Sequence, residues 1–504
     1  MTYKPTDPFK DSILSLLNHL TQTIYLTSLV AGLSFWVSPS TFDINIVYLI
    51  FCTLTLMLIF LCTTIFLILS NIHLFRAYYP PTKVENRRNI STDKVPDTMD
   101  CKKLSEEAML AYEGAEQALE IFHPRLKNKC VDTAIYNTEP ISIEACPRYI
   151  DSLVAATNAF FGGFAINAQA VGARLSTAFI YIKIELGKGV RLESIVKYQS
   201  DLARDLKEAC VNFEVHNGEV TLKVKREDRI TVEAGHVFNG NKCKAMDVIL
   251  GLDRNNDYYT FNLTNMPHML ISGTTGSGKS VAIHSIIASL LTSTPANLLR
   301  FMLLDPKQIE FAIYQDLPNL IAPVITCENK ALVYVEWLVQ EMNRRYSMLS
   351  NSGARNIEEY NGAATIKKRL PYIVLVVDEL GDLMLGSNSK AFEHALVKLA
   401  QKSRAAGIHM ILSTQRPSAS IFTGLLKSNV PTRLACKVAS KMESRIILDQ
   451  AGAESLLGRG DMLFYVPGMD EPVRIQSPYI TNDLIKETVE YCNENLLTGR
   501  KISR

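Results

Sequence analysis

A glycine-rich segment that ends in a lysine and a serine carries the clearest chemistry in this sequence. Gly273-Thr-Thr-Gly-Ser-Gly-Lys-Ser280 matches the pattern GxxxxGK[ST], in which the backbone wraps around phosphates at the start of a helix. We expect Lys279 to reach the β- and γ-phosphates of ATP and Ser280 to ligate Mg²⁺. An ordinary glycine-rich turn is the alternative. The residues expected to contact the nucleotide are Gly273, Thr274, Thr275, Gly276, Ser277, Gly278, Lys279, Ser280 and Val281.

Two adjacent acids, Asp378 and Glu379, follow the continuous apolar run Tyr372–Val377. Such a run is typical of a central parallel strand, and the carboxyl ends of parallel strands face the ligand crevice. We therefore expect Asp378 to hold Mg²⁺ through water and Glu379 to polarise the attacking water, as a hydrolase requires. Adjacent acids are also common on protein surfaces, but the apolar strand before them favours the catalytic interpretation.

A further polar pair, Thr414 and Gln415, follows the apolar segment 408–413. A polar side chain at a strand tip can contact the γ-phosphate and respond to its loss, so Gln415 is a candidate catalytic residue. A loop glutamine without such a role is an equally good interpretation.

The elements that must position these groups can be identified from hydrophobic patterning. His268–Ser272 is a short apolar run before the glycine-rich segment, and residues 281–291 have the composition of the helix that should follow. From about 248 to 481, apolar strands alternate with longer helices. This alternation predicts an α/β fold with a mainly parallel sheet covered on both faces, in an ATPase domain at 241–485 followed by a tail at 486–504.

A small α/β (β-α-β-β) domain is predicted at 149–240. Residues 180–186 alternate between apolar and polar, Ile195, Leu202 and neighbouring apolar residues recur at helical spacing, and two further strands meet at Asn217-Gly218, a strong hairpin signal. This domain carries no catalytic constellation, so we interpret it as a structural or ring-forming module. The polar residues 81–148 before it are interpreted as a cytoplasmic connector.

The N-terminal part, 1–80, has the pattern of a two-helix membrane anchor. Residues 12–42 contain no Asp, Glu, Lys or Arg, and 46–70 are uncharged and rich in Leu, Ile and Phe. We predict transmembrane helices at about 15–38 and 46–70. Lys and Arg flank the pair and are absent from its loop, which predicts an inner-membrane protein with its motor in the cytoplasm. A cleaved signal peptide is less favoured, because the start is not strongly basic.

Composition restricts the remaining classes of function. The net charge of +2 over 504 residues creates no overall basic field, so any contact with nucleic acid must come from local groups. The 10 cysteines form no CxxC pair, which argues against a structural metal and favours reduced thiols.

Motifs between about 150 and 485 resemble the FtsK/SpoIIIE family of DNA translocases. They are MPHMLISGTTGSGKS (266–280), LDPK (304–307), VVDE (376–379), RAAGIH (404–409), STQRPS (413–418), TGLLKSNVPTR (423–433) and SRIILDQAGAESLLGRGDML (444–463). The resemblance implies a RecA-like P-loop ATPase that assembles as a homohexameric ring around double-stranded DNA, with ATP between subunits. The domain at 149–240 looks like the α domain of the family.

Further residue roles are implied by this resemblance. A neighbouring subunit should supply an arginine to the γ-phosphate, and the candidates are Arg433 and Arg445, with Arg416 third. Lys427, Lys437 and Lys441 are candidates for contacts to DNA phosphates, although a solvated basic face explains each lysine equally well. Asp305 and Lys307 follow another strand end and could couple hydrolysis to movement.

The sequence also departs from the family pattern. About 25 residues follow Tyr479, so we expect no C-terminal winged-helix domain, and two predicted spans replace the more usual four. These departures favour a plasmid, phage or integrative-element motor over chromosome-dimer resolution, although chromosome segregation remains open. The alternatives are conjugative DNA transfer, a pump for a protein cargo, and a non-enzymatic ring-assembly protein, against which Glu379 argues.

Overall fold

The computed structural model describes residues 126–136, 147–207, 211–216, 218–239 and 243–497. The chain divides into two compact units, 1–97 and 98–504, and every described element belongs to the second. The predicted transmembrane helices therefore lie outside the described residues. Among the helices that are described, none is both long and apolar enough to cross a membrane.

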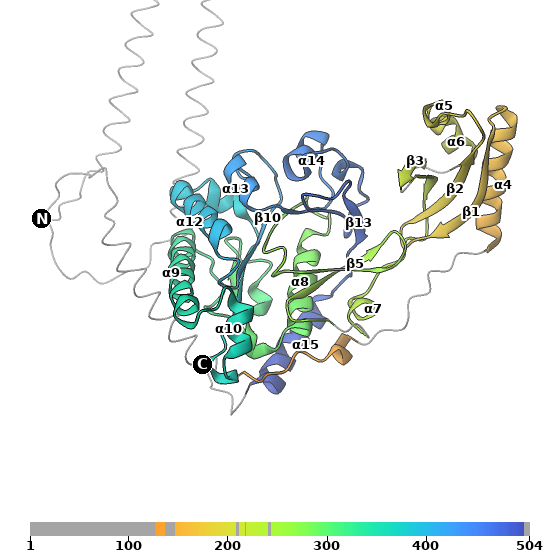
Figure 1. The fold of residues 1–504 in the computed structure, drawn as a ribbon. Helices are drawn as coiled ribbons and strands as arrows, with labels where there is room; N and C mark the ends of the chain where they lie inside the picture. Colours follow the sequence, from red (N-terminus) through yellow and green to blue (C-terminus); the bar gives the residue numbers. More distant parts are fainter. Residues whose placement is uncertain (1–125, 137–146, 208–210, 217, 240–242, 498–504) are drawn as a thin grey trace, which may run out of the picture. The chain divides into compact units, whose positions relative to one another are not determined.

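A nine-stranded sheet forms the larger part of the described chain, in the order β6-β5-β13-β12-β11-β7-β10-β9-β8 (Figure 1). Its last five strands are parallel to one another. They are β11 (Thr432–Ala435), β7 (His268–Ser272), β10 (Ile408–Thr414), β9 (Tyr372–Val377) and β8 (Leu299–Leu304). Because β10 lies between β7 and β9, its carboxyl end separates the glycine-rich segment from the two acids.

The other half of the sheet is antiparallel, so the prediction of a mainly parallel sheet was wrong. This half contains β6 (Tyr258–Asn262), β5 (Asp247–Asp253), β13 (Val473–Gln476) and β12 (Asp461–Tyr465). Short connections join β5 to β6 and β12 to β13, and a connection of that length can only link antiparallel neighbours. The sheet is thus mixed, and its parallel half carries the polar strand ends.

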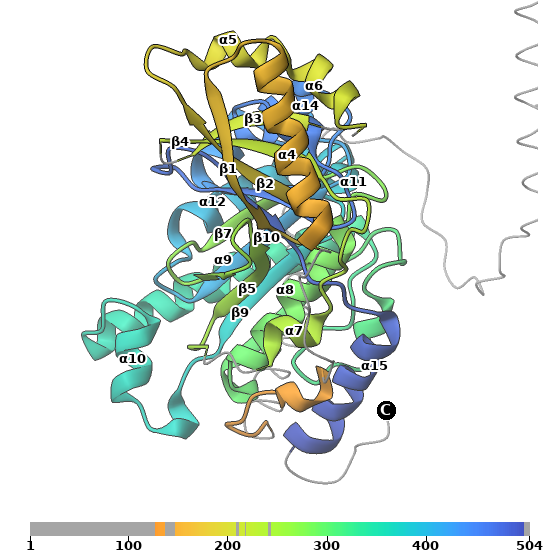
Figure 2. The ribbon, with the colours of Figure 1, turned by 90° about the vertical axis from the view of Figure 1, so that its right-hand side faces the viewer.

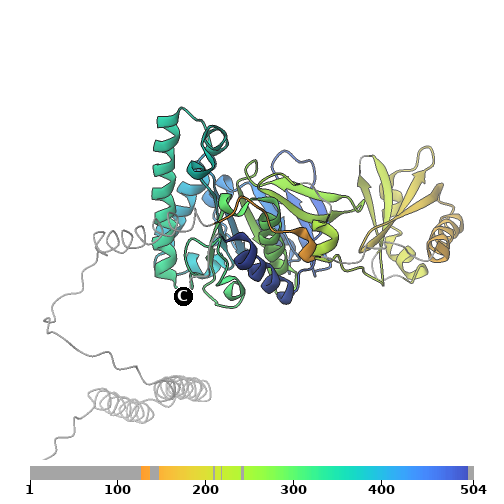
Figure 3. The ribbon, with the colours of Figure 1, turned by 90° about the horizontal axis from the view of Figure 1, so that it is seen from below.

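Two hydrophobic cores lie on opposite faces of this sheet. Along β9, Val374 and Val376 belong to one core, whereas Ile373, Leu375 and Val377 belong to the other. The first core includes α8 (Lys279–Ser293) and α15 (Asn482–Tyr491), and the second includes α9 (Glu328–Ser352) and α12 (Ser389–Lys402) (Figures 1 and 3). Shorter helices complete the layers: α7 (Ala234–Phe238), α10 (Ile357–Ala363), α11 (Leu380–Met384), α13 (Gly424–Asn429) and α14 (Lys441–Leu448).

A separate four-stranded antiparallel sheet has the order β1-β2-β4-β3. Its strands are β1 (Ala168–Leu175), β2 (Phe179–Leu186), β3 (Val211–His216) and β4 (Glu219–Lys225). One face packs against α4 (Pro147–Gly163) and α6 (Gln199–Asp205), with α5 (Leu192–Val196) beside them (Figure 2). The sequence prediction missed α4 and β1. In β1, small residues and a register shift between Ala170 and Gly172 interrupt the alternation of apolar and polar side chains.

A short segment, 126–136, packs against the part of the chain that contains the nine-stranded sheet. Leu126 forms a β-bridge with Leu497, and the Val131 amide donates to the Leu291 carbonyl at 3.0 Å, near the end of α8. The Tyr136 hydroxyl lies 3.0 Å from the Thr488 hydroxyl of α15. This part of the predicted connector is therefore packed structure.

Candidate functional site

The glycine-rich segment forms a tight loop between β7 and α8. Gly276 and Gly278 have φ angles of 76° and 99°, in the left-handed region that favours glycine. A Cβ at Gly278 would lie 2.2 Å from the Gly460 amide nitrogen, and a Cβ at Gly273 would lie 2.5 Å from the Cys436 Cβ. The loop backbone therefore requires glycine at these positions, and it leads directly into α8 with no side-chain cap.

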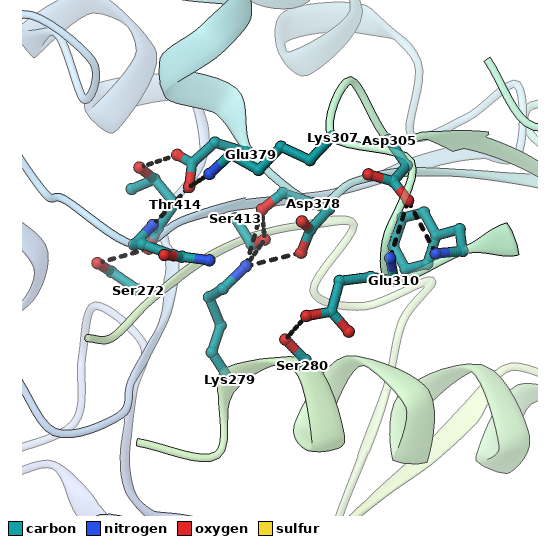
Figure 4. A network of polar contacts seen from close by, with 12 residues as sticks. Ser272, Lys279, Ser280, Asp305, Lys307, Glu310, Asp378, Glu379, Ser413 and Thr414 are labelled. Carbon is teal, nitrogen blue, oxygen red and sulfur yellow. Dashed lines mark hydrogen bonds and ion pairs between the residues drawn. The ribbon is translucent and has the colours of Figure 1, made fainter. Parts of the chain in front are cut away.

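Lys279 is buried beneath this loop and is paired with Asp378 at the end of β9 (Figure 4). Its Nζ donates to Asp378 Oδ1 at 2.8 Å, to the Asp378 carbonyl at 2.8 Å and to Ser413 Oγ at 3.1 Å. Burial raises the pKa of Asp378, and the Lys279 ammonium opposes this increase. The arrangement joins the phosphate loop to two strand ends through a buried ion pair.

Glu379 points toward the tip of β10 and accepts four hydrogen bonds. Oε1 accepts from the Thr414 hydroxyl at 2.6 Å and the Gly381 amide at 3.2 Å. Oε2 accepts from the Gln415 amide at 3.1 Å and Lys307 Nζ at 3.3 Å. Burial alone would raise the pKa of Glu379, but the hydrogen bonds from Thr414 and Gln415 outweigh it and lower the pKa. The carboxylate is thus held ionised and fully bonded.

Gln415 lies beside the phosphate loop, since its side-chain oxygen accepts from the Thr275 hydroxyl at 3.3 Å. The structure therefore brings Lys279, Asp378, Glu379 and Gln415 into one site. The sequence predicts that they follow three different apolar strands, and the order β7-β10-β9 brings the ends of these strands together.

Ser280 is the residue that we expect to ligate Mg²⁺. In the structure its hydroxyl donates a hydrogen bond to Glu310 Oε1 at 2.7 Å (Figure 4). Glu310 was not singled out from the sequence. It lies in the irregular segment after β8, and the segment LDPK just before it was the nearest signal that could have drawn attention to it.

A second loop, 456–461, contacts the phosphate loop through its backbone. The Gly460 amide donates to the Ser277 carbonyl at 2.9 Å, and the Arg459 amide donates to the Gly276 carbonyl at 3.4 Å. Gly458, Arg459 and Gly460 all have positive φ angles. These three residues belong to one of the motifs that resemble the family, but the sequence did not predict that they contact the phosphate loop.

The three arginine candidates occupy different environments. Arg433 is 4% exposed, and it donates to the Lys427 carbonyl at 2.6 Å within its own subunit. Its burial lowers the pKa of the guanidinium to about 10. Arg445 on α14 and Arg416 after β10 are exposed. Only the latter two present their side chains at the surface.

The three lysine candidates for DNA contact also differ. Lys427 forms an ion pair with Asp449 at 2.5 Å, which partly neutralises it. Lys437 and Lys441 are exposed, and the Lys437 carbonyl accepts from the Thr274 amide of the phosphate loop at 2.9 Å.

The donor set of this site fits Mg²⁺, a hard cation that prefers oxygen ligands. The Ser280 hydroxyl and the Asp378 carboxylate are the protein oxygens available to it. In the described part of the chain, no three or more His, Cys, Asp or Glu side chains are placed to hold a metal ion together. A Mg²⁺ ion here would therefore complete its coordination with nucleotide phosphates and water, as is usual for this ion.

A lysine-bearing phosphate loop after a parallel strand, with two acids at the end of the next strand but one, defines the fold of a P-loop ATPase. Residues 240–419 match the FtsK/SpoIIIE family.

The chain is 40% identical over 347 residues to the DNA translocase FtsK of Streptococcus pneumoniae, covering 66% of this chain and 45% of the relative. It is 38% identical over 402 residues to the DNA translocase FtsK 1 of Neisseria meningitidis serogroup B, covering 72% of this chain and 49% of the relative. The chain thus spans less than half the length of either relative.

A solved structure with the same fold is the conjugation coupling protein TcpA of pCW3, in its monomer form with ATPγS. The TM-score is 0.50 at 25% sequence identity, and the match covers 68% of this chain and 99% of that one.

Proposed function

We propose that this chain hydrolyses ATP and uses the energy to move along double-stranded DNA. The observation that carries the proposal is the convergence of Lys279, at the start of α8, with Asp378 and Glu379 at the end of β9, in a chain whose residues 240–419 match the FtsK/SpoIIIE family. The named relatives are DNA translocases, which supports DNA as the substrate.

In this mechanism, a Mg²⁺ ion at this site would supply positive charge that offsets the charge of the ATP phosphates. Ser280 and Asp378 would hold the ion. Lys279 leaves its ion pair with Asp378 and instead pairs with the phosphates of ATP. Glu379 accepts a hydrogen bond from the attacking water and polarises it. Gln415, beside Thr275 of the phosphate loop, responds to the loss of the γ-phosphate.

The active assembly is a homohexameric ring with ATP between subunits, held at the cell inner membrane by residues 1–80 with the motor in the cytoplasm. Arg445 or Arg416 of one subunit reaches the nucleotide of the next, since both are exposed whereas Arg433 is buried. Lys437 and Lys441 contact DNA phosphates, and Lys427 contributes less because it is paired with Asp449.

The test is the ATPase rate of the full-length protein in detergent, with and without linear double-stranded DNA, alongside Lys279→Ala and Glu379→Gln. Strong stimulation by DNA in the wild type, absent in both variants, supports the proposal. An ATPase rate that is the same with and without DNA, across a range of salt concentrations, would contradict the proposal.

Conjugative DNA transfer is a second candidate setting for the same chemistry, and the likeness to TcpA favours it. In host cells that carry a mobilisable plasmid, Lys279→Ala should then abolish plasmid transfer and leave chromosome segregation normal. A segregation defect with normal transfer would instead support a role on the chromosome.

A further inference from the structure

Glu310 lies where it can orient the metal ligand of the phosphate loop. We propose that Glu310 is a positioning residue for Mg²⁺, which acts through the Ser280 hydroxyl and through water on the ion. This inference rests on the proposed ATPase function and adds a second carboxylate, beside Asp378, to its metal site.

The direction of one hydrogen bond carries the argument. Ser280 Oγ donates its proton to Glu310 Oε1 at 2.7 Å, so the lone pairs of Ser280 Oγ remain free for a cation. A hydroxyl without this acceptor can rotate and turn its proton toward the metal. Outer partners that fix ligand orientation in this way commonly change metal affinity by about 10- to 100-fold.

Glu310 is itself held by a buried acid at the end of β8. Asp305 Oδ2 accepts from the Glu310 and Phe311 amides at 3.0 Å each, and Asp305 is fully buried. These bonds fix the backbone of the loop over the start of α8, as Figure 4 shows. The backbone of Glu310 is therefore set independently of Ser280.

The second carboxylate oxygen of Glu310 faces α8. Oε2 lies 3.6 Å from His284 Nε2, one turn beyond Ser280, and His284 Nδ1 lies 3.0 Å from the Tyr314 hydroxyl. Glu310 is half-buried, so this oxygen also remains accessible to water. A carboxylate oxygen in this position could accept a hydrogen bond from a water of a bound Mg²⁺ ion.

The experiment measures the equilibrium affinity of the full-length protein for a fluorescent ATP analogue, in Mg²⁺ and in EDTA. In the wild type, Mg²⁺ should strengthen binding. Glu310→Ala should reduce this Mg²⁺-dependent gain by about tenfold or more, while the affinity in EDTA stays within about twofold. Glu310→Gln keeps one acceptor oxygen and should recover part of the gain. The exposed Glu487→Gln on α15 is the matched control and should behave as wild type.

Two outcomes would overturn the proposal. One is a Glu310→Ala protein with the full Mg²⁺-dependent gain, and the other is an equal loss of affinity in Mg²⁺ and EDTA, which would indicate a purely structural contact. A wild-type protein whose binding gains nothing from Mg²⁺ would count against the ATPase proposal itself, so the two failures can be distinguished. Binding in EDTA also shows that each variant is folded.

Discussion

The carboxylate of Glu379 accepts a hydrogen bond of 2.6 Å from the hydroxyl of Thr414, at the tip of the neighbouring strand. With the Gly381 amide, the Gln415 amide and Lys307 Nζ as further donors, all lone-pair positions of the carboxylate are engaged. Water can therefore bind Glu379 only after one of these donors is released. In the proposed mechanism, these hydrogen bonds would therefore restrain hydrolysis until one donor moves away.

Thr414→Val removes one donor and should raise the ATPase rate measured without DNA. A typical hydrogen bond contributes about 1 kcal/mol, so the expected increase is roughly two- to fivefold. The measurement is a steady-state rate, with exposed Thr365→Val as the control. A lower rate would mean that Thr414 holds Glu379 in its productive position.

Lys307→Met should move the acidic limb of the pH–rate profile. The ammonium of Lys307, 3.3 Å from Glu379 Oε2, helps to lower the pKa of that carboxylate. Without it the pKa rises, so activity is lost at a higher pH as the solution is acidified. The measurement is kcat against pH with saturating ATP. An unshifted acidic limb would show that the ionisation of Glu379 does not limit the rate.

Asp378→Ala should destabilise the nucleotide-free protein, because it leaves the Lys279 ammonium buried without its carboxylate partner. Removing one member of a buried pair costs about 3–5 kcal/mol. ATP in EDTA should restore more stability to this variant than to the wild type, because its phosphates replace the lost anion. Urea unfolding with and without ATP measures both effects, and exposed Asp470→Ala is the control. Equal stabilisation of both proteins by ATP would contradict the exchange of partners by Lys279.

Because His268 and His409 are buried, we expect the free energy of unfolding to decrease in mild acid. Burial is the main cause that lowers the pKa of both imidazoles to about 3. For His268, the neighbouring His409 lowers the pKa as well. The unfolded chain titrates near 6.5, so it binds more protons than the folded chain between about pH 3 and 6.5. Stability is therefore complete above about pH 6.5 and decreases as pH falls, by roughly 1.4 kcal/mol per pH unit per histidine.

The corresponding measurement is the urea midpoint between pH 7.5 and 5, where ordinary carboxylates stay ionised. His268→Leu should flatten this dependence by about half, and exposed His394→Gln should leave it as in the wild type. An unchanged slope in His268→Leu would show that this imidazole is not the group that titrates on unfolding.

Some parts of the fold were predictable from local pattern, and others depended on distant contacts. Strands β7 and β9 are fully buried apolar runs, so the sequence marks both ends of each. The antiparallel half was missed because alternation between strands and helices does not specify where a hairpin replaces a crossover.

Among the site residues, the phosphate loop and the two acids follow spacing rules, whereas Glu310 does not. Its contact with Ser280 depends on how the segment after β8 folds back over α8, with Asp305 as the buried acceptor of its backbone. The burial of Arg433 was equally hidden, because the four residues of β11 give too short a pattern to indicate a buried strand.

Segment 126–136 attaches the preceding part of the chain close to the end of α8. Val131 is bonded to Leu291 near the last turn of α8, and the first turn of the same helix carries Lys279 and Ser280. A pull on the chain from before residue 126 would therefore act on α8 before it acted on the four-stranded sheet. If the proposed translocase is held at its N-terminal end, a load on the bound DNA would act first on the helix that carries Lys279 and Ser280.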